Sequence, residues 1–282
     1  MSSNSSVRRS LLRAVKNRLR DANVPFPILL EPIDYLARVI NGKDDLPPLR
    51  LRKASGPLSS FETSSVSFIA FLSAAAGIHP THRMLDIGCG CGGIALQLRG
   101  FFHDGGGYTG VDIYAPSVSW CQSHLTKSDA RLQFMRINVR NAQYNPAGTE
   151  DAATFVFPFD DKTFDVILLK SVFTHMRPEQ VGNYLKEIHR LLRDGGHCLM
   201  SFFLLTAERE KLIQRGQSPT FAYGQGVWRY SDQHLPERAI AYDEEYVMGQ
   251  LDKHGLVLER PILYAHQDIL LATPRVPGVR GG

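Results

Sequence analysis

The chain has 282 residues, of which 43% are hydrophobic and 21% charged, and its formal net charge is +4. A chain of this length and apolar content buries a large core, so we expect an ordinary globular protein. The basic excess is concentrated in residues 1–20, which contain six Arg or Lys residues and no acidic residue. Because the remainder is close to neutral, a broad nucleic-acid-binding face is not expected.

Cysteine spacing and hydropathy exclude several classes of protein. The cysteines at positions 89, 91, 121 and 198 show neither the paired spacing of a zinc site nor the density of a disulfide scaffold. We therefore expect no metal site. No signal-peptide stretch and no long apolar run is present, so we expect a cytoplasmic protein without a transmembrane segment.

The N-terminal region precedes any sheet-like pattern. Apolar residues recur at helical spacing over residues 6–20, which predicts a basic amphipathic helix. Two hypotheses for this helix are a packing arm or homodimer contact, and peripheral contact with a membrane surface or an anionic ligand. Five prolines interrupt residues 21–56, which predicts an extended wrap with one helix at 31–40. A further helix is expected at about 61–76.

From residue 83 the chain alternates short apolar runs with amphipathic stretches, which is typical of a parallel sheet covered by helices. The predicted strands are 83–88, 107–112, 131–137, 164–170 and 197–205. The predicted helices are about 92–102, 115–127 and 178–193, the last closing at Gly195-Gly196. A helix at 243–254 and strands at 256–263 and 267–273 follow. The last two strands are too close for a crossover helix, so the sheet is expected to end in an antiparallel hairpin.

The segment MLDIGCGCGG, residues 84–93, predicts a loop that binds a nucleotide-derived cofactor. Gly88, Gly90 and Gly93 have the spacing of a dinucleotide fingerprint, and they join a buried strand to a helix N-terminus. Asp86 stands two positions before the first glycine. Its carboxylate would repel a pyrophosphate but suits a cofactor that carries an ammonium group. Cys89 is expected to serve as a small side chain beside the ligand.

Polar residues also follow the next two strands. Asp112 ends the second strand, where ribose hydroxyls are bound in such folds. Ile113 beside it is expected to lie against an adenine face, and Asn138 and Val139 follow the third strand at the adenine edge. A site for adenosine, ribose and an amino-acid tail fits S-adenosylmethionine.

Residues 61–273 resemble the class I S-adenosylmethionine-dependent methyltransferases. The likeness rests on MLDIGCGCGG, on Asp112 and on EIHRLLRDGGHCLMSFF. The segment around SVFTHM is similar to a bacterial group of small-molecule methyltransferases. The resemblance implies a Rossmann-like α/β fold with a mostly parallel seven-stranded sheet, and S-adenosylmethionine as cofactor. From the residues we expect a helical N-terminal extension at 1–60, made of the basic helix and the extended wrap. A methyltransferase domain at 61–282, with a substrate-facing insertion at about 206–242, is expected to follow.

Two positions depart from the family pattern. Asn138 stands where an Asp is frequent, and Lys170 stands after the fourth strand, where a small polar residue is more usual. A cation is unexpected near a sulfonium. Lys170 is therefore expected either to point away from the cofactor or to serve an anionic acceptor.

Few sequence features indicate which residues bind the methyl acceptor. His175, after the fourth strand, is the candidate general base because its pKa lies near neutrality; the alternative is a structural histidine. Tyr223, Trp228 and Tyr230 belong to a Gly-rich insertion with little core to join, so they are the candidate substrate-binding residues.

Several functions remain open. The favoured one is O-methylation of a sugar or secondary-metabolite hydroxyl. A second is C-methylation of an isoprenoid diphosphate or unsaturated lipid, with Arg52, Lys53 or Lys170 holding the diphosphate. An NAD(P)-dependent oxidoreductase and a non-catalytic cofactor-binding protein are the alternatives of other classes. No Pro-Cys nucleophile occurs and the motif of amino-methylating DNA enzymes is absent, which argues against methylation of nucleic-acid bases.

Overall fold

The computed structural model describes residues 26–56, 58 and 61–275. Contacts between Cα atoms divide the chain into two compact units, Met1–Glu62 and Thr63–Gly282. The basic helix predicted at residues 6–20 lies outside the described residues.

The N-terminal unit is more helical than its prolines predict. Helix α2 spans Phe26–Ile40, and a second helix, α3, spans Leu49–Ala54. The helix predicted at 31–40 is confirmed, although it begins earlier, at Phe26, whereas the prediction that the rest of this region is extended misses α3. Pro48 takes the N-cap position of α3, where no helical N–H is needed, and Glu31 accepts the backbone N–H groups of Leu49 and Arg50.

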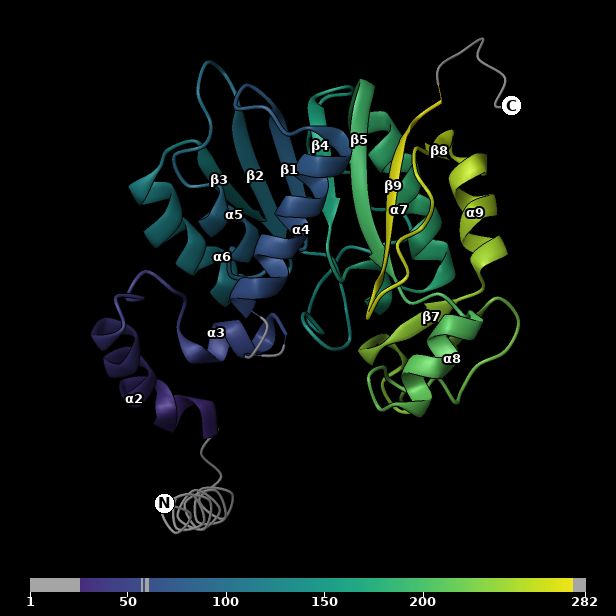
Figure 1. The fold of residues 1–282 in the computed structure, drawn as a ribbon, viewed down its shortest axis with the longest axis horizontal. Coiled ribbons are helices and arrows are strands. Elements are labelled where there is room, and N and C mark those ends of the chain that lie inside the picture. Colours follow the sequence, from purple (N-terminus) through teal and green to yellow (C-terminus); the bar gives the residue numbers. More distant parts are fainter. Residues whose placement is uncertain (1–25, 57, 59–60, 276–282) are drawn as a thin grey trace. The chain divides into compact units, whose positions relative to one another are not determined.

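The second unit contains the predicted seven-stranded sheet, in the order β3-β2-β1-β4-β5-β9-β8 (Figure 1). The strands are β1 (Arg83–Ile87), β2 (Gly107–Asp112), β3 (Leu132–Arg136), β4 (Phe164–Leu169), β5 (Leu192–Phe202), β8 (Leu256–Leu258) and β9 (Asp268–Pro274). The first five strands pair in parallel, whereas β9 is antiparallel to both β5 and β8. The Rossmann-like fold with an antiparallel end is confirmed.

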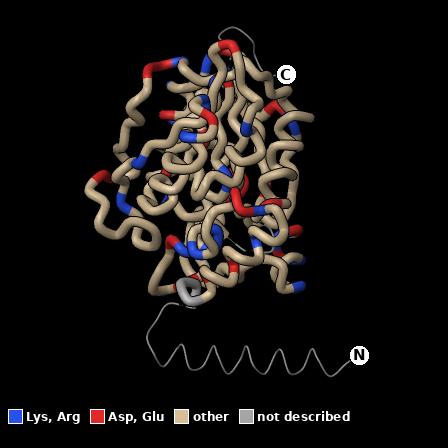
Figure 2. Tube along the Cα trace, turned by 90° about the vertical axis from the view of Figure 1, so that its left-hand side faces the viewer, with Lys and Arg blue, Asp and Glu red and all other residues tan. Residues whose placement is uncertain are grey.

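Helices cover both faces of the sheet. Alternate strand residues, such as Met84 and Leu85, enter two different hydrophobic clusters. On the face of Met84 lie α4 (Phe61–Ala76), α5 (Gly93–Gln97) and α6 (Ala115–Cys121), which continues into the π-helical turn η2 (Gln122–Thr126). On the face of Leu85 lie α7 (Pro178–Leu191) and α9 (Glu244–Lys253). Figure 2 shows acidic and basic residues interspersed along the trace.

Several predicted boundaries are wrong. Helix α7 ends at Leu191, not at the glycine pair, because Leu192 already pairs with Phe164 of β4. Gly195, with φ of 77°, belongs to the bulge before pairing resumes at His197. Helix α5 ends at Gln97 rather than near residue 102. Strand β8 ends at Leu258, so the hairpin connection, residues 259–267, is longer than predicted.

The insertion after β5 has regular structure that its sequence pattern did not predict. It contains α8 (Ala207–Gln214), β6 (Trp228–Tyr230), the turn η4 (Pro236–Arg238) and β7 (Ile240–Tyr242). Strands β6 and β7 form a small antiparallel sheet. Arg209 ties the insertion to the main sheet through a buried ion pair with Asp268, at 2.6 Å. Within the described part of the chain, every helix falls short of the length and apolarity that a membrane span needs.

Candidate functional site

The glycine loop after β1 is a tight turn that requires its glycines. Gly88, Gly90 and Gly92 have φ values of 76°, 54° and 77°, a region that residues with a Cβ rarely adopt. A Cβ on Gly88 would lie 2.4 Å from Cγ2 of Val172, which follows β4. The loop therefore packs directly against the segment that carries His175.

Asp112 holds this loop at the carboxyl edge of the sheet. One carboxylate oxygen accepts the N–H of Gly90 and the other accepts the N–H of Tyr114, both at 2.7 Å. Burial raises the pKa of Asp112, and the two N–H donors oppose that rise. Each oxygen retains a lone pair, so the carboxylate has the capacity to accept two hydroxyl groups as well.

Asp86 is a buried carboxylate with one unused oxygen. Its Oδ2 accepts a hydrogen bond from the Tyr108 hydroxyl at 2.5 Å, whereas its Oδ1 has no partner among the described residues. Burial raises the pKa of Asp86 to about 7, against the opposing effects of Tyr108 and Lys170. An orphaned carboxylate oxygen is costly, so this position fits a group that brings hydrogen-bond donors and positive charge.

Lys170 lies on the α4 side of the sheet. Its Nζ donates to the Ser64 hydroxyl of α4 at 2.8 Å. Burial lowers the pKa of Lys170, and the charge of Asp86 opposes this effect. Lys170 and Asp86 therefore belong to one electrostatic network, which the spacing of the two residues in the sequence did not predict.

The residues predicted at the adenine edge have partners within the protein. The Asn138 Nδ2 donates to the Thr149 hydroxyl at 2.9 Å, and its Oδ1 accepts from Asn145 at 3.3 Å. Val139 is buried, and its carbonyl accepts from Asn145 at 2.9 Å. Ile113 packs at the margin of the core. Asn138 thus helps to order the loop that follows β3, and adenine contacts by these residues stay predictions.

The cysteines near the loop are packing residues. Cys89 and Cys91 are buried, and burial raises the pKa of the Cys89 thiol well above its usual value. A Cβ on Gly110 would lie 2.8 Å from the Cys89 sulfur, so strand and loop are in close contact. The described residues contain no group of three His, Cys, Asp or Glu side chains placed to hold a metal ion.

His175 is held in one tautomer. Its Nδ1 lies 2.8 Å from the backbone carbonyl oxygen of Glu237. A carbonyl only accepts, so Nδ1 carries the proton and Nε2 keeps a free lone pair in the neutral ring. Burial lowers the pKa of His175, which keeps the ring neutral near pH 7. These features suit either a general base or a structural histidine.

Tyr144 is a site residue that the sequence analysis missed. Its ring meets the His175 ring edge-on, with centroids 5.4 Å apart. Burial, and secondarily the charge of Asp112, raise the pKa of Tyr144. Tyr144 thus connects the cofactor side of the sheet edge with the segment of His175.

The three predicted acceptor-binding aromatics form one cluster. The Tyr223 and Tyr230 rings stack with centroids 5.8 Å apart, and Trp228 lies 5.1 Å from Tyr230. Tyr223 is 38% exposed, whereas Trp228 and Tyr230 are partly buried against the core. Gly224, with φ of 90°, allows the close turn that brings the Tyr230 ring to the backbone.

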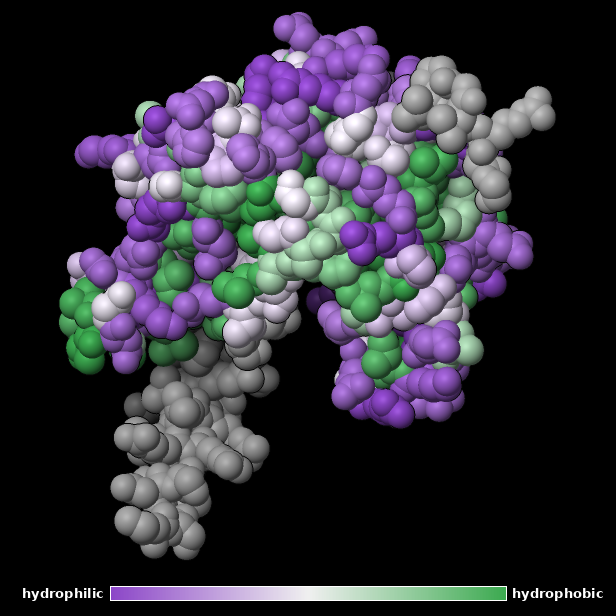
Figure 3. Space-filling view, turned by 45° about the horizontal axis from the view of Figure 1, so that its top comes forward, coloured by the Kyte–Doolittle hydropathy of each residue, from purple (hydrophilic) through white to green (hydrophobic). Residues whose placement is uncertain are grey.

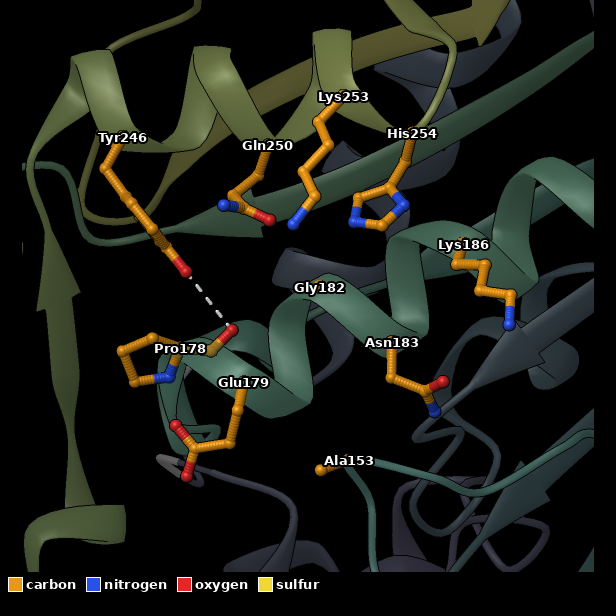
Figure 4. A pocket seen from close by; sticks show the side chains of 10 residues that line it. All are labelled: Ala153, Pro178, Glu179, Gly182, Asn183, Lys186, Tyr246, Gln250, Lys253 and His254. Atoms are coloured by element: carbon orange, nitrogen blue, oxygen red, sulfur yellow. Dashed lines mark hydrogen bonds between the residues drawn. The ribbon is translucent and has the colours of Figure 1, made fainter.

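A separate pocket lies between α7 and α9 (Figure 4). It has a volume of about 330 Å³ and is lined mostly by polar side chains, including Glu179, Lys186 and Lys253. The Tyr246 hydroxyl crosses one end and donates to the Pro178 carbonyl at 3.2 Å. None of the residues predicted for the cofactor, the base or the acceptor lines this pocket, so it is not the site described above.

The sequence is similar to those of known methyltransferases. Residues 85–200 match the family model described as a methyltransferase domain. The chain is similar to the sterol 24-C-methyltransferase erg6 of Schizosaccharomyces pombe, with 29% identity over 45% of this chain and 29% of the relative. It is also similar to the tRNA N(3)-cytidine methyltransferase METTL2 of Danio rerio, with 25% identity over 44% of this chain and 32% of the relative. The chain thus spans about a third of the length of these relatives.

Solved structures show the same fold. The magnesium protoporphyrin IX methyltransferase ChlM from Synechocystis PCC 6803, with bound S-adenosylhomocysteine, superposes with a TM-score of 0.51 and 18% identity. The match covers 77% of this chain and 84% of that protein. Residues 85–200 thus match a methyltransferase domain, and the chain has the fold of the class I, S-adenosylmethionine-dependent methyltransferases.

Proposed function

We propose that the protein transfers a methyl group from S-adenosylmethionine to a hydroxyl group of a small molecule, such as a sugar or a secondary-metabolite scaffold. The observation that carries the hydroxyl assignment is the fixed tautomer of His175. A neutral imidazole with a free Nε2 can take the proton that a hydroxyl loses as it attacks. The resemblance of the SVFTHM segment to bacterial small-molecule methyltransferases supports the same acceptor class.

The residues around the glycine loop fit the cofactor. Asp112 has free lone pairs for the two ribose hydroxyls, and the unpartnered Oδ1 of Asp86 suits the ammonium of the amino-acid tail. Asn138, Val139 and Ile113 are assigned to the adenine. Gly88, Cys89 and Gly90 let the backbone approach closely. When bound, S-adenosylmethionine supplies a methyl carbon already activated for displacement by its sulfonium.

The protein's part in the reaction is to position the acceptor and to move one proton. His175 accepts that proton at Nε2 while the carbonyl of Glu237 holds its Nδ1–H. Tyr144 packs against the His175 ring and keeps its orientation. Tyr223, Trp228 and Tyr230 provide an aromatic surface for the acceptor.

The test is transfer of labelled methyl groups to a panel of sugar and phenolic hydroxyl acceptors, with His175→Asn beside the wild type. Asn retains a donor for the Glu237 carbonyl but has no basic nitrogen. The variant should bind S-adenosylhomocysteine normally and lose roughly 10²–10⁴-fold in kcat. An unchanged kcat would assign His175 a structural role only.

Carbon methylation of an unsaturated lipid or isoprenoid diphosphate is a second candidate, favoured by the similarity to a sterol 24-C-methyltransferase. In that case Lys170 would bind an anionic acceptor group. Replacement of Lys170 by Ala should then raise the KM for a diphosphate acceptor strongly. An unchanged KM would remove this candidate, because the side chain would serve only Ser64 and Asp86.

A further inference from the structure

Helix α2 of the N-terminal unit has its polar and apolar faces reversed. A surface helix normally turns its apolar stripe inward and its polar face toward solvent. In α2 the Asp34 and Arg38 side chains pair with each other and are only 14% and 10% exposed. Asp34 also forms an ion pair with Arg52 of α3.

Further hydrogen bonds fix this orientation. Arg38 donates to the backbone carbonyls of Asp44, at 3.2 Å, and Leu46, at 2.5 Å. On the same face, Glu31 accepts the N–H groups at the start of α3. Five polar contacts join the charged face of α2 to the rest of its unit, and α2 cannot turn this face outward without breaking them.

The opposite face of α2 is apolar and exposed. Its residues and their exposed fractions are Ile33 (64%), Tyr35 (55%), Leu36 (59%), Val39 (47%) and Ile40 (81%). Ile33, Leu36 and Ile40 stand at helical spacing, and Tyr35 and Val39 flank them, so the five form one stripe. Figure 3 shows hydrophobic surface at α2. Single exposed apolar residues are ordinary, but a contiguous stripe marks an interaction surface.

Charge indicates what covers this stripe. The 20 residues at the start of the chain, which precede α2 closely, carry six Arg or Lys residues and no acidic residue. A second copy of the chain would bring another segment of the same positive charge. A membrane with anionic phospholipids offers both complements: phosphate groups for the cations and an acyl boundary for the apolar stripe.

We propose that the apolar stripe of α2 binds the surface of membranes that contain anionic phospholipid. Contact with a membrane would determine where the protein works, and it does not depend on methyl transfer. Tyr35 fits such an interface, because its ring has an apolar body and a polar hydroxyl. Helix α2 would lie in the plane of the interface without crossing the bilayer.

The experiment is co-sedimentation of the full chain with vesicles of phosphatidylcholine alone and of phosphatidylcholine mixed with phosphatidylglycerol. The wild type should bind only the anionic vesicles. The variant I33E/L36E/I40E should lose roughly tenfold or more of this binding. The control M135E/V156E/L263E adds the same charge at other exposed apolar positions and should bind like the wild type. Equal affinity of both variants for S-adenosylhomocysteine would verify folding.

Three results would overturn the proposal. The first is a wild type that does not sediment with anionic vesicles or binds neutral ones equally well. The second is unchanged vesicle binding by I33E/L36E/I40E. The third is a wild-type dimer in analytical ultracentrifugation that this variant dissociates, without any vesicle binding, since the stripe would then contact a second copy.

Discussion

The Tyr108 hydroxyl donates to Oδ2 of Asp86 at 2.5 Å, while the Oδ1 of the same carboxylate is buried without a partner among the described residues. The two side chains come from neighbouring strands, and the charge of Lys170 acts on Asp86. Burial is the larger influence, because it raises the pKa of Asp86 to about 7 despite the hydrogen bond. The ionised carboxylate therefore predominates only above about pH 7.

Cofactor binding should depend on pH through Asp86. The ammonium of the amino-acid tail is attracted by the ionised carboxylate, which is populated above the folded-state pKa of about 7. Affinity for S-adenosylhomocysteine should rise by about tenfold from pH 6 to pH 8, because only about a tenth of a group with this pKa is ionised one unit lower. Calorimetric titration at several pH values measures this change in affinity.

The variant D86N supplies the control for this pH dependence. Its amide can still accept from Tyr108 but carries no charge, so its affinity should be low and flat between pH 6 and pH 8. A wild-type profile as flat as that of D86N would show that Asp86 does not meet the ammonium group.

Asp112 should be essential for cofactor affinity. The change D112N weakens both its acceptance of ribose hydroxyls and its hold on the Gly90 and Tyr114 N–H groups. Loss of such charge-assisted hydrogen bonds should lower affinity by roughly 10–100-fold. The control is D165N, because Asp165 also accepts a backbone N–H, from Arg83, and an Arg193 guanidinium. Equal losses in the two variants would place the ribose elsewhere.

Two glycines separate the effect of contact from the effect of backbone conformation. Gly88 and Gly100 have similar φ values, 76° and 70°, but a Cβ would meet Val172 at the first and open space at the second. Gly100→Ala should cost only the backbone strain, of order 1–2 kcal/mol. Gly88→Ala should lower the Tm more than Gly100→Ala does, because its Cβ also clashes with Val172. It should also weaken S-adenosylhomocysteine binding.

The double variant G88A/V172A tests the cause of the larger loss. Removing the Val172 side chain relieves the clash, so part of the lost stability should return. No recovery in thermal unfolding would mean that the Val172 contact does not set the loop position.

The pair of Arg209 and Asp268 should anchor the insertion. The two side chains are 1% and 3% exposed, and Asp268 also accepts the Leu204 N–H at 2.8 Å. Replacing Arg209 by Met leaves a buried carboxylate without its cation and should cost about 3–5 kcal/mol of unfolding free energy. Replacing Lys162, which forms an exposed ion pair with Asp194, should cost less than about 1 kcal/mol of unfolding free energy. Similar losses in denaturant unfolding would contradict this account.

The strand pattern made much of the fold predictable. The buried runs of β1 to β4 end at Ile87, Asp112, Arg136 and Leu169, within a residue or two of the predicted positions, because alternation and turn residues mark them locally. The antiparallel end followed from the short spacing between the last two strands.

Long-range contacts account for what the sequence did not predict. The Glu237 side chain accepts the N–H of Ala142 at 2.5 Å, although 95 residues separate the two. The backbone carbonyl of Glu237 also accepts a hydrogen bond from Nδ1 of His175. No periodicity marks such contacts, and the role of Tyr144 depends on them. The start of β5 at Leu192 was missed because the glycine pair resembles a helix end, whereas pairing with β4 decides the structure.

The most direct test of the central claim is calorimetric titration of the full chain with S-adenosylhomocysteine and, separately, with NADH. We expect saturable one-site binding of S-adenosylhomocysteine that D112N weakens, and no binding of NADH. Binding of NADH without binding of S-adenosylhomocysteine would contradict it and would make the glycine loop a dinucleotide site.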